Sequence, residues 1–132
     1  MNAEPSSRTG TILVVDDESA VTGPIQVLLA KSGYDVYLAQ DGVEGVKLAS
    51  EVHPDLIILD ITMPGMDGYE VAERLKGLPK VKDVPIIFLT GKSASEDGGK
   101  AFAKGGATFV RKPFSAKQLR DLVELAMQSV RE

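Results

Sequence analysis

The sequence predicts an α/β protein in which helices cover both faces of a doubly wound, five-stranded parallel sheet. Short runs of branched aliphatic residues alternate with amphipathic segments along most of the chain. The runs near residues 12, 56 and 86 are continuously apolar, which is typical of strands buried on both faces of a parallel sheet. Because crossovers between parallel strands are right-handed, five strand–helix repeats with short connections build such a sandwich.

The predicted strands follow the aliphatic runs in chain order. Their ranges are 12–15, 35–39, 56–59, 84–89 and 108–110. Residues 1–10 are rich in Ser, Glu, Pro and Gly and lack apolar periodicity, so we expect a flexible N-terminal tail there. Since 132 residues suffice for one domain and are few for two, we expect residues 11–132 to form a single domain.

Most of the five predicted helices begin with Asp or Ser followed three residues later by Glu or Gln, a pattern that caps helix N-termini. The pairs are Asp41 with Glu44, Asp67 with Glu70, Ser93 with Glu96, and Ser115 with Gln118. Behind the last pair, an apolar stripe with charged residues outside it predicts an amphipathic helix.

Two of the predicted helices contain residues that disfavour a helix. The fourth carries Gly98-Gly99 in its middle, where each glycine costs roughly 1 kcal/mol relative to alanine, so we expect it to be weakly formed until a modification or a partner orders it. The first contains Gly23-Pro24. Because proline cannot donate to the carbonyl four residues earlier, we expect this helix to begin near Thr22 or to be kinked.

The composition restricts the function classes. A net charge of −4 argues against a nucleic-acid-binding surface. The chain has no cysteine, which excludes disulfides and thiol catalysis, and its only histidine, His53, lies in a loop-like segment without a nucleophile signature. No apolar stretch approaches the ~20 residues of a membrane span. We therefore expect a cytoplasmic protein that does not bind membranes or nucleic acid directly.

Polar residues follow four of the predicted strands. Asp16 and Asp17, followed by Glu18, come after the first strand, Asp60 ends the third, Thr90 ends the fourth, and Lys112 follows the fifth. In a parallel sheet these positions meet at the carboxyl edge, where ligands bind. Each residue alone has a plain structural explanation, such as capping a helix or ending a strand. Their joint placement indicates a functional site.

Three carboxylates at one site require a counter-charge, since each close pair repels by a few kcal/mol at an effective dielectric of about 20. Oxygen ligands without Cys or His favour Mg²⁺, with Mn²⁺ as a substitute. Lys112 balances the remaining charge and leaves a pocket suited to a phosphoryl group. Asp60 is then the predicted nucleophile, and Thr90 is predicted to donate a hydrogen bond to the transferred group.

Four separated segments, in this order, make the chain resemble the receiver domain of two-component response regulators. They are residues 12–18, 55–68, 85–90 and 112–114, which read ILVVDDE, DLIILDITMPGMDG, PIIFLT and KPF. The resemblance implies that Asp60 is the phosphoacceptor and that Asp16 and Asp17 form the acidic metal pocket with it. It further implies that Thr62 binds the metal through its backbone carbonyl and that Thr90 and Lys112 contact the phosphoryl group.

The same resemblance implies a flavodoxin-type, CheY-like strand order of 2-1-3-4-5 and a cis bond between Lys112 and Pro113. It places Thr90 and Phe109 as a switch pair, with an ordinary core phenylalanine as the alternative interpretation of Phe109. The implied phosphodonor is a histidine kinase or a histidine phosphotransfer protein. The implied output surface is the fourth helix, fifth strand and fifth helix, used by a monomer or a weak dimer to bind an unidentified partner.

The predicted function is thus a single-domain response regulator that is phosphorylated on Asp60 in a Mg²⁺-dependent reaction and signals through a partner. It is not expected to be an enzyme with an external product, since its only chemistry is taking up a phosphoryl group and hydrolysing it. Two alternatives stay open: a docking module that works without phosphorylation, and a fragment of a longer regulator with an output domain. A small-substrate phosphatase is disfavoured because the chain has no room for a capping domain.

Overall fold

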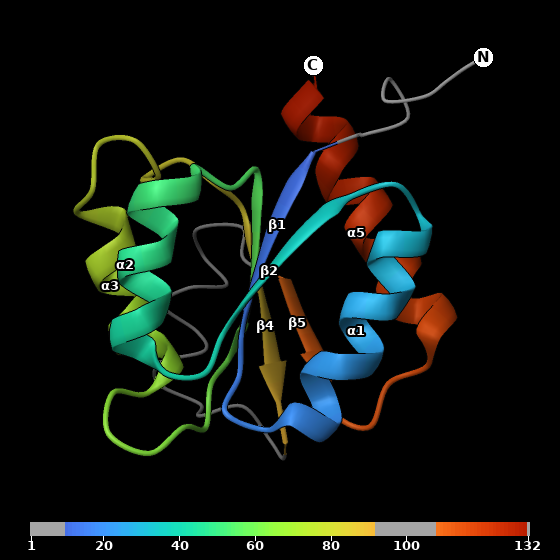
Figure 1. The fold of residues 1–132 in the computed structure, drawn as a ribbon, viewed down its shortest axis with the longest axis horizontal. Coiled ribbons are helices and arrows are strands. Elements are labelled where there is room, and N and C mark those ends of the chain that lie inside the picture. The colour runs from blue at the N-terminus through green and yellow to red at the C-terminus, as the bar shows by residue number, and fades with distance from the viewer. Residues whose placement is uncertain (1–9, 92–107, 132) are drawn as a thin grey trace.

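A computed structural model describes residues 10–91 and 108–131 of the chain. Five parallel strands form one sheet in the order β2-β1-β3-β4-β5, which confirms the predicted fold class and strand order (Figure 1). The strands are β1 (Thr11–Val15), β2 (Asp35–Ala39), β3 (Leu56–Asp60), β4 (Ile86–Thr90) and β5 (Thr108–Arg111). Asp60 and Thr90 are therefore the last residues of their strands.

Four helices cover the sheet within the described residues. Helices α1 (Ser19–Lys31) and α5 (Ala116–Arg131) lie on one face, and α2 (Gly42–Val52) and α3 (Gly68–Lys76) lie on the other (Figure 1). The predicted fourth helix, with Ser93, Glu96 and Gly98-Gly99, falls outside the described residues. None of the described helices combines the length and apolar character that crossing a bilayer would need.

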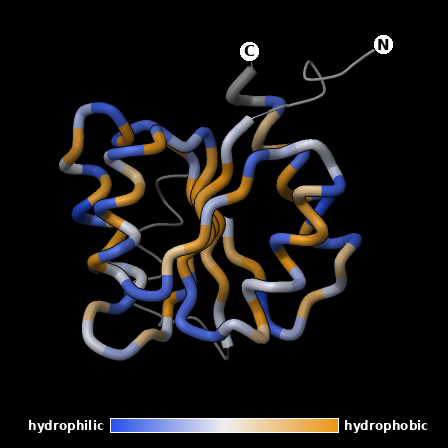
Figure 2. Tube along the Cα trace, in the orientation of Figure 1, coloured by the Kyte–Doolittle hydropathy of each residue, from blue (hydrophilic) through white to orange (hydrophobic). Residues whose placement is uncertain are grey.

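The hydrophobic core consists of two layers separated by the sheet. Successive residues of the central strands point to opposite faces, so that Leu13 and Leu59 pack toward α2 and α3 while Val14 and Ile58 pack toward α1 and α5. Figure 2 shows these central strands as a continuous hydrophobic band between the helical layers. Each fully buried Leu or Ile contributes about 1.5–3 kcal/mol, which explains why the strands read as uninterrupted apolar runs.

Three of the four predicted capping pairs form the expected bonds. The Glu44 amide donates to the Asp41 carboxylate at 2.8 Å, and the Gln118 amide donates to the Ser115 hydroxyl at 3.0 Å. At α3 the bonds are reciprocal, because the Glu70 amide donates to Asp67 at 2.9 Å and the Asp67 amide donates to Glu70 at 3.2 Å. The pair at Ser93 lies outside the described residues.

The prediction that α1 begins near Thr22 is wrong. The helix begins at Ser19, and Pro24 lies inside it. Its first turn is closed by the Glu18 carbonyl, which accepts from the Val21 amide at 2.9 Å and the Thr22 amide at 3.1 Å. An interior proline costs about 3 kcal/mol, but Ile25 and Leu29 are buried on the same helix, and burial of two such side chains outweighs that cost. A kink at Pro24 stays a prediction.

Candidate functional site

The carboxyl edge of the sheet brings the predicted site residues together. Backbone hydrogen bonds continue the ladder past the strand ends, because the Asp16 amide donates to Ala39 at 3.1 Å and the Lys112 amide donates to Thr90 at 2.7 Å. The Ile61 amide donates to Leu89 at 3.0 Å in the same way. These bonds hold the residues that follow β1, β3 and β5 in register with the sheet.

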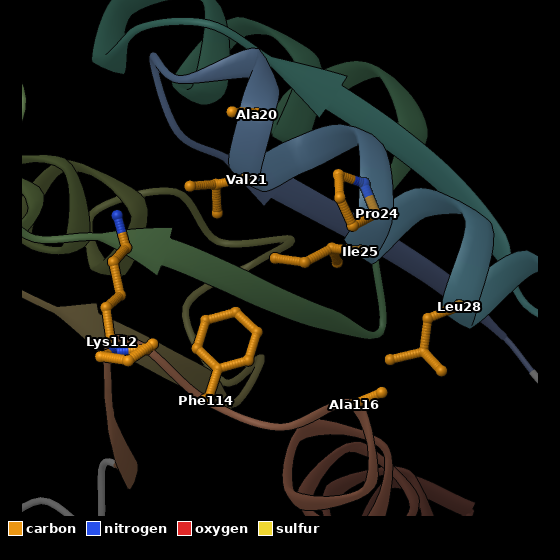
Figure 3. A pocket seen from close by; sticks show the side chains of 9 residues that line it. Ala20, Val21, Pro24, Ile25, Leu28, Lys112, Phe114 and Ala116 are labelled. Carbon is orange, nitrogen blue, oxygen red and sulfur yellow. The ribbon is translucent and has the colours of Figure 1, made fainter.

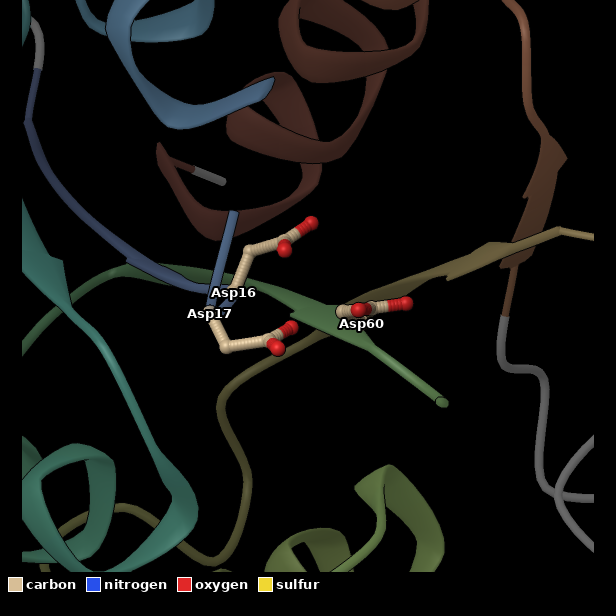
Figure 4. Close-up of side chains that lie close together, drawn as sticks. All are labelled: Asp16, Asp17 and Asp60. Carbon is tan, nitrogen blue, oxygen red and sulfur yellow. The ribbon is translucent and has the colours of Figure 1, made fainter. Parts of the chain in front are cut away.

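Asp16, Asp17 and Asp60 form a compact group of carboxylates. Each offers one oxygen, and these oxygens lie within 4.8 Å of one another (Figure 4). Asp16 and Asp60 are only 1% and 2% exposed, whereas Asp17 faces solvent. The group consists of oxygen donors alone, which suits a hard divalent cation such as Mg²⁺ and gives a softer metal no nitrogen or sulfur ligand.

The Lys112 ammonium lies between these carboxylates. Its Nζ atom is 3.1 Å from Asp16 Oδ2 and 3.4 Å from Asp60 Oδ1, and a third contact joins it to Glu18 Oε1 at 3.4 Å. The sequence placed Glu18 at this edge but assigned it no role. Its position directly after Asp17 was the only available signal, because the contact spans 94 residues of sequence.

Two further hydrogen bonds orient the buried carboxylates. The Glu18 amide donates to Asp16 Oδ1 at 2.9 Å, so that both oxygens of Asp16 have partners. The Thr62 amide donates to Asp60 Oδ1 at 3.2 Å. The Asp60 carboxylate is therefore held in one orientation at the end of β3, while Thr62 itself is exposed. Metal binding through the Thr62 carbonyl stays a prediction.

The electrostatics of the site are unfavourable for a charged Asp60. Burial, and next the neighbouring Asp16 carboxylate, raise the pKa of Asp60 to about 6, although Lys112 and the Thr62 amide act in the opposite direction. Burial acts to lower the pKa of Lys112, but its contacts with Asp16 and Asp60 outweigh this and raise it above the usual value. Lys112 is thus fully charged at neutral pH, and the site still holds more negative than positive charge.

The carboxylates face an open cleft. Its walls come from the strand ends and the loops that follow them, namely Asp17, Glu18, Asp60, Ile61, Thr62, Met63, Pro64, Thr90, Gly91 and Lys112. Among the described residues, no atom beyond its chain neighbours would lie within 4 Å of a Cβ at Gly91. The described residues therefore leave room for a group the size of phosphate to approach Asp60.

Gly68 supports the site from behind and was not singled out by the sequence. Its amide donates to the Ile61 carbonyl at 2.9 Å, and a Cβ at this position would collide with the backbone of Asp60 and Ile61. Only glycine allows the start of α3 to lie this close to the end of β3. The backbone that carries Asp60 is thereby fixed from both sides.

The proposed switch residues lie on neighbouring strands. Thr90 is 7% exposed at the end of β4. Phe109, half-buried in β5, stacks on Phe88 with ring centroids 5.1 Å apart. This stacking is also what a plain core phenylalanine would show, so the switch role of Phe109 stays a prediction. The Lys112-Pro113 bond is cis, as predicted.

An apolar hollow of about 440 Å³ adjoins the cleft on the α1 side (Figure 3). It is lined by Ala20, Val21, Pro24, Ile25, Leu28, Lys112, Pro113, Phe114 and Ala116. Lys112 lines both the hollow and the cleft. Its alkyl chain borders the hollow (Figure 3), and its ammonium lies among the carboxylates. The sequence did not predict this feature, because its lining combines α1 with the loop before α5.

Comparisons with known proteins agree with this geometry. The family model of the response regulator receiver domain matches residues 12–124. The DNA-binding dual master transcriptional regulator RpaA of Synechocystis is 35% identical over 108 residues, which cover 82% of this chain and 45% of that protein. The chain thus spans less than half the length of this relative.

Solved structures show the same likeness. Chemotaxis protein CheY4 of Vibrio cholerae superposes with a TM-score of 0.81 at 29% identity, covering 88% of this chain and 97% of that one. The signal receiver domain of a histidine kinase from Syntrophus aciditrophicus gives a TM-score of 0.81 at 34% identity, covering 92% of each chain. With the family model spanning most of its length, the chain belongs to the response regulator receiver domain family.

Proposed function

We propose that this chain is a phosphorylation switch that accepts a phosphoryl group on Asp60 from a histidine kinase or a histidine phosphotransfer protein. The observation that carries the proposal is a buried, oriented Asp60 carboxylate that opens onto a solvent-accessible cleft beside two further carboxylates and the Lys112 ammonium. Membership of the receiver family supports it, since receiver domains are phosphoacceptors that bind Mg²⁺ in an acidic pocket.

The chemistry follows from these positions. An oxygen of Asp60 attacks phosphorus, the new O–P bond forms as the N–P bond of the donor phosphohistidine breaks, and the imidazole leaves with the electron pair. Lys112 stabilises negative charge on the transferred oxygens, and Thr90 donates a hydrogen bond to them. Asp16, Asp17, Asp60 and the Thr62 carbonyl would hold Mg²⁺ or Mn²⁺, which when bound supplies further charge neutralisation. Water later hydrolyses the acyl phosphate, which regenerates the Asp60 carboxylate and releases inorganic phosphate.

A direct test uses acetyl phosphate and Mg²⁺ with intact-mass measurement. The wild type should gain the mass of one phosphoryl group, and Asp60→Asn should gain none. Asp83→Asn, which removes an exposed carboxylate far from the cleft, is the matched control and should be labelled like the wild type. Equal labelling of Asp60→Asn and the wild type would show that another residue is modified.

The output is proposed to pass through a partner that reads the surface of α5, β5 and the segment between β4 and β5, with Thr90 and Phe109 coupling it to Asp60. RpaA, described as a DNA-binding regulator, is longer than this chain, so an output domain in a longer natural protein is an alternative. A docking module that works without phosphorylation is the other. A docking module of this kind would bind its partner with the same affinity in three forms: the untreated wild type, the Asp60→Asn variant, and the wild type after treatment with acetyl phosphate.

A further inference from the structure

We propose that Glu18 is a positioning residue that holds the Lys112 ammonium in the unmodified protein and releases it when Asp60 carries a phosphoryl group. This inference rests on the proposed function and adds a residue to it. It starts from the contact between Glu18 Oε1 and Lys112 Nζ at 3.4 Å, which joins the start of α1 to the loop after β5.

The local structure presents Glu18 to Lys112 instead of to the helix. Glu18 occupies the N-cap position of α1, and its side chain makes no capping bond, as expected for a side chain longer than those of the Asp, Asn, Ser and Thr residues that usually cap helices. Its own amide is bound to Asp16 Oδ1 at 2.9 Å, which fixes the backbone. The carboxylate is left to reach Lys112 from the solvent side of the cleft.

The ammonium has three N–H donors and three carboxylate neighbours, Asp16, Glu18 and Asp60. A phosphoryl group on Asp60 converts one carboxylate oxygen into the bridging oxygen of an acyl phosphate and brings new, more highly charged oxygens into the cleft. The N–H that now faces Asp60 Oδ1 can turn to one phosphoryl oxygen, but to contact a second oxygen Lys112 has to give up Asp16 or Glu18. The partner that Lys112 gives up is the carboxylate whose charge costs less free energy when the ammonium is absent.

Asp16 is the costly partner to lose. Its side chain is 0% exposed and lies 3.1 Å from Nζ, so that its charge would be left buried without a cation. The Glu18 side chain is 60% exposed and lies 0.3 Å farther from Nζ, so that water can replace the ammonium at little cost. Lys112 therefore keeps Asp16 and exchanges Glu18 for the phosphoryl oxygens.

Because the pair exists only in the unmodified state, it opposes phosphorylation. Exposed ion pairs contribute little, and removing this one should tighten binding of a phosphoryl analogue by about two- to fivefold. The analogue is beryllofluoride with saturating Mg²⁺, and its affinity can be followed through backbone amide chemical shifts. The sign of the change in affinity distinguishes two roles for Glu18. If Glu18 instead held Lys112 in the position that binds the phosphoryl group, its substitution would weaken beryllofluoride binding.

Two substitutions separate the contact from a general charge effect. Glu18→Gln keeps the length and removes the charge, whereas Glu18→Asp keeps the charge and is one methylene too short for the 3.4 Å contact. Both should tighten beryllofluoride binding if the contact matters. Tightening in Glu18→Gln with wild-type affinity in Glu18→Asp would show a through-space effect and overturn the proposal. Thermal unfolding of each variant checks that the fold is intact.

Glu51→Gln is the matched control, because Glu51 is an exposed glutamate at the end of α2, at the opposite edge of the sheet. It changes the net charge equally and should leave the affinity unchanged. Asp60→Asn separates this inference from the proposed function. If the wild type and Asp60→Asn both fail to bind beryllofluoride, the proposed function fails. If the wild type binds and Glu18→Gln binds equally or more weakly, only the role of Glu18 is refuted.

Discussion

Acidic residues have contrasting surroundings at the two edges of the sheet. At the amino edge, Asp55 lies just before β3, and its Oδ2 accepts from the Thr11 amide at 2.9 Å while its own amide donates to the Thr11 carbonyl at 2.8 Å. At the carboxyl edge, Asp60 shares its surroundings with Asp16 and one ammonium, and burial raises its pKa. Asp55 thus joins the segment before β3 to the start of β1, whereas Asp60 is held at an electrostatic cost.

This difference separates a structural edge from a functional one. A carboxylate that accepts backbone hydrogen bonds stabilises the loops it joins. A cluster of carboxylates with too little positive charge lowers stability, and such a cost is retained where a site needs it. Substitutions at the two edges should therefore change the free energy of unfolding with opposite signs for the same class of residue.

The largest effect is expected for Lys112→Ala. Its loss leaves Asp16 and Asp60 buried without a cation, and the free energy of unfolding in Mg²⁺-free buffer should fall by about 2–4 kcal/mol at neutral pH. Denaturant titration measures this. Lys117→Ala is the control, since it breaks an exposed pair with Asp121 on α5 and should change stability much less. Similar losses for both would mean that the ammonium does not stabilise the cluster.

Asp60→Asn should raise stability in the absence of a divalent cation. The folded pKa of Asp60 is about 6 against an ordinary value of 3.8, so the folded state binds this proton more tightly and wild-type stability falls as the pH rises through that interval. The variant should gain about 1–2 kcal/mol above pH 6, less than the full shift because the cleft is open to solvent, and nothing below pH 4.

Mg²⁺ should reverse the order of these two proteins. A ligand that binds only the folded state stabilises it by mass action, and the wild type offers three carboxylates where Asp60→Asn offers two. Thermal unfolding with increasing Mg²⁺ should therefore raise the midpoint of the wild type more than that of the variant. Equal shifts would argue against Asp60 as a metal ligand.

Asp55→Ala tests the amino edge and should have the opposite sign to Asp60→Asn. It leaves the Thr11 amide, at the half-buried start of β1, without its acceptor, which costs about 1 kcal/mol. The loss should be the same with and without Mg²⁺, because Asp55 lies at the other end of the strands. Chemical denaturation under both conditions checks this, and a dependence on Mg²⁺ would contradict the division between the edges.

The smallest effect is expected for His53→Gly, also at the amino edge. His53 ends α2 with φ of 50°, in the left-handed region that favours glycine. Relief of this backbone strain, partly offset by the greater freedom of glycine in the unfolded chain, should stabilise the protein by about 0.5–1 kcal/mol. The midpoint of denaturation should rise without a change in slope. A loss of stability would indicate that the imidazole makes a contact that matters more.

The pattern of apolar and polar residues was enough to predict several local features. Strands buried on both faces need apolar residues at every position, and helix caps involve residues three positions apart, so both features are visible in short windows of sequence. The bonds at Asp41, Asp67 and Ser115 confirm this. The convergence of Asp16 and Asp60 was also predictable, because parallel strands end at one edge.

The start of α1 was not predictable in this way. Gly23 and Pro24 disfavour a helix locally, but Ile25 and Leu29 pack into the layer between the sheet and α5. The free energy of that burial comes from residues distant in sequence, and it overrides a local preference. Gly68 is a similar case, since its need for glycine arises only where α3 meets the end of β3.

The sequence by itself determined the α/β class, the strand-end positions of Asp16, Asp17, Asp60, Thr90 and Lys112, and the hard-oxygen character of the cluster, because these depend on periodicity, spacing and residue type. Only the tertiary structure decided how Lys112 divides its contacts among Asp16, Glu18 and Asp60. It also decided that Asp60 is buried enough to shift its pKa. Both depend on distances of a few ångströms between residues far apart in the chain, which no local pattern encodes.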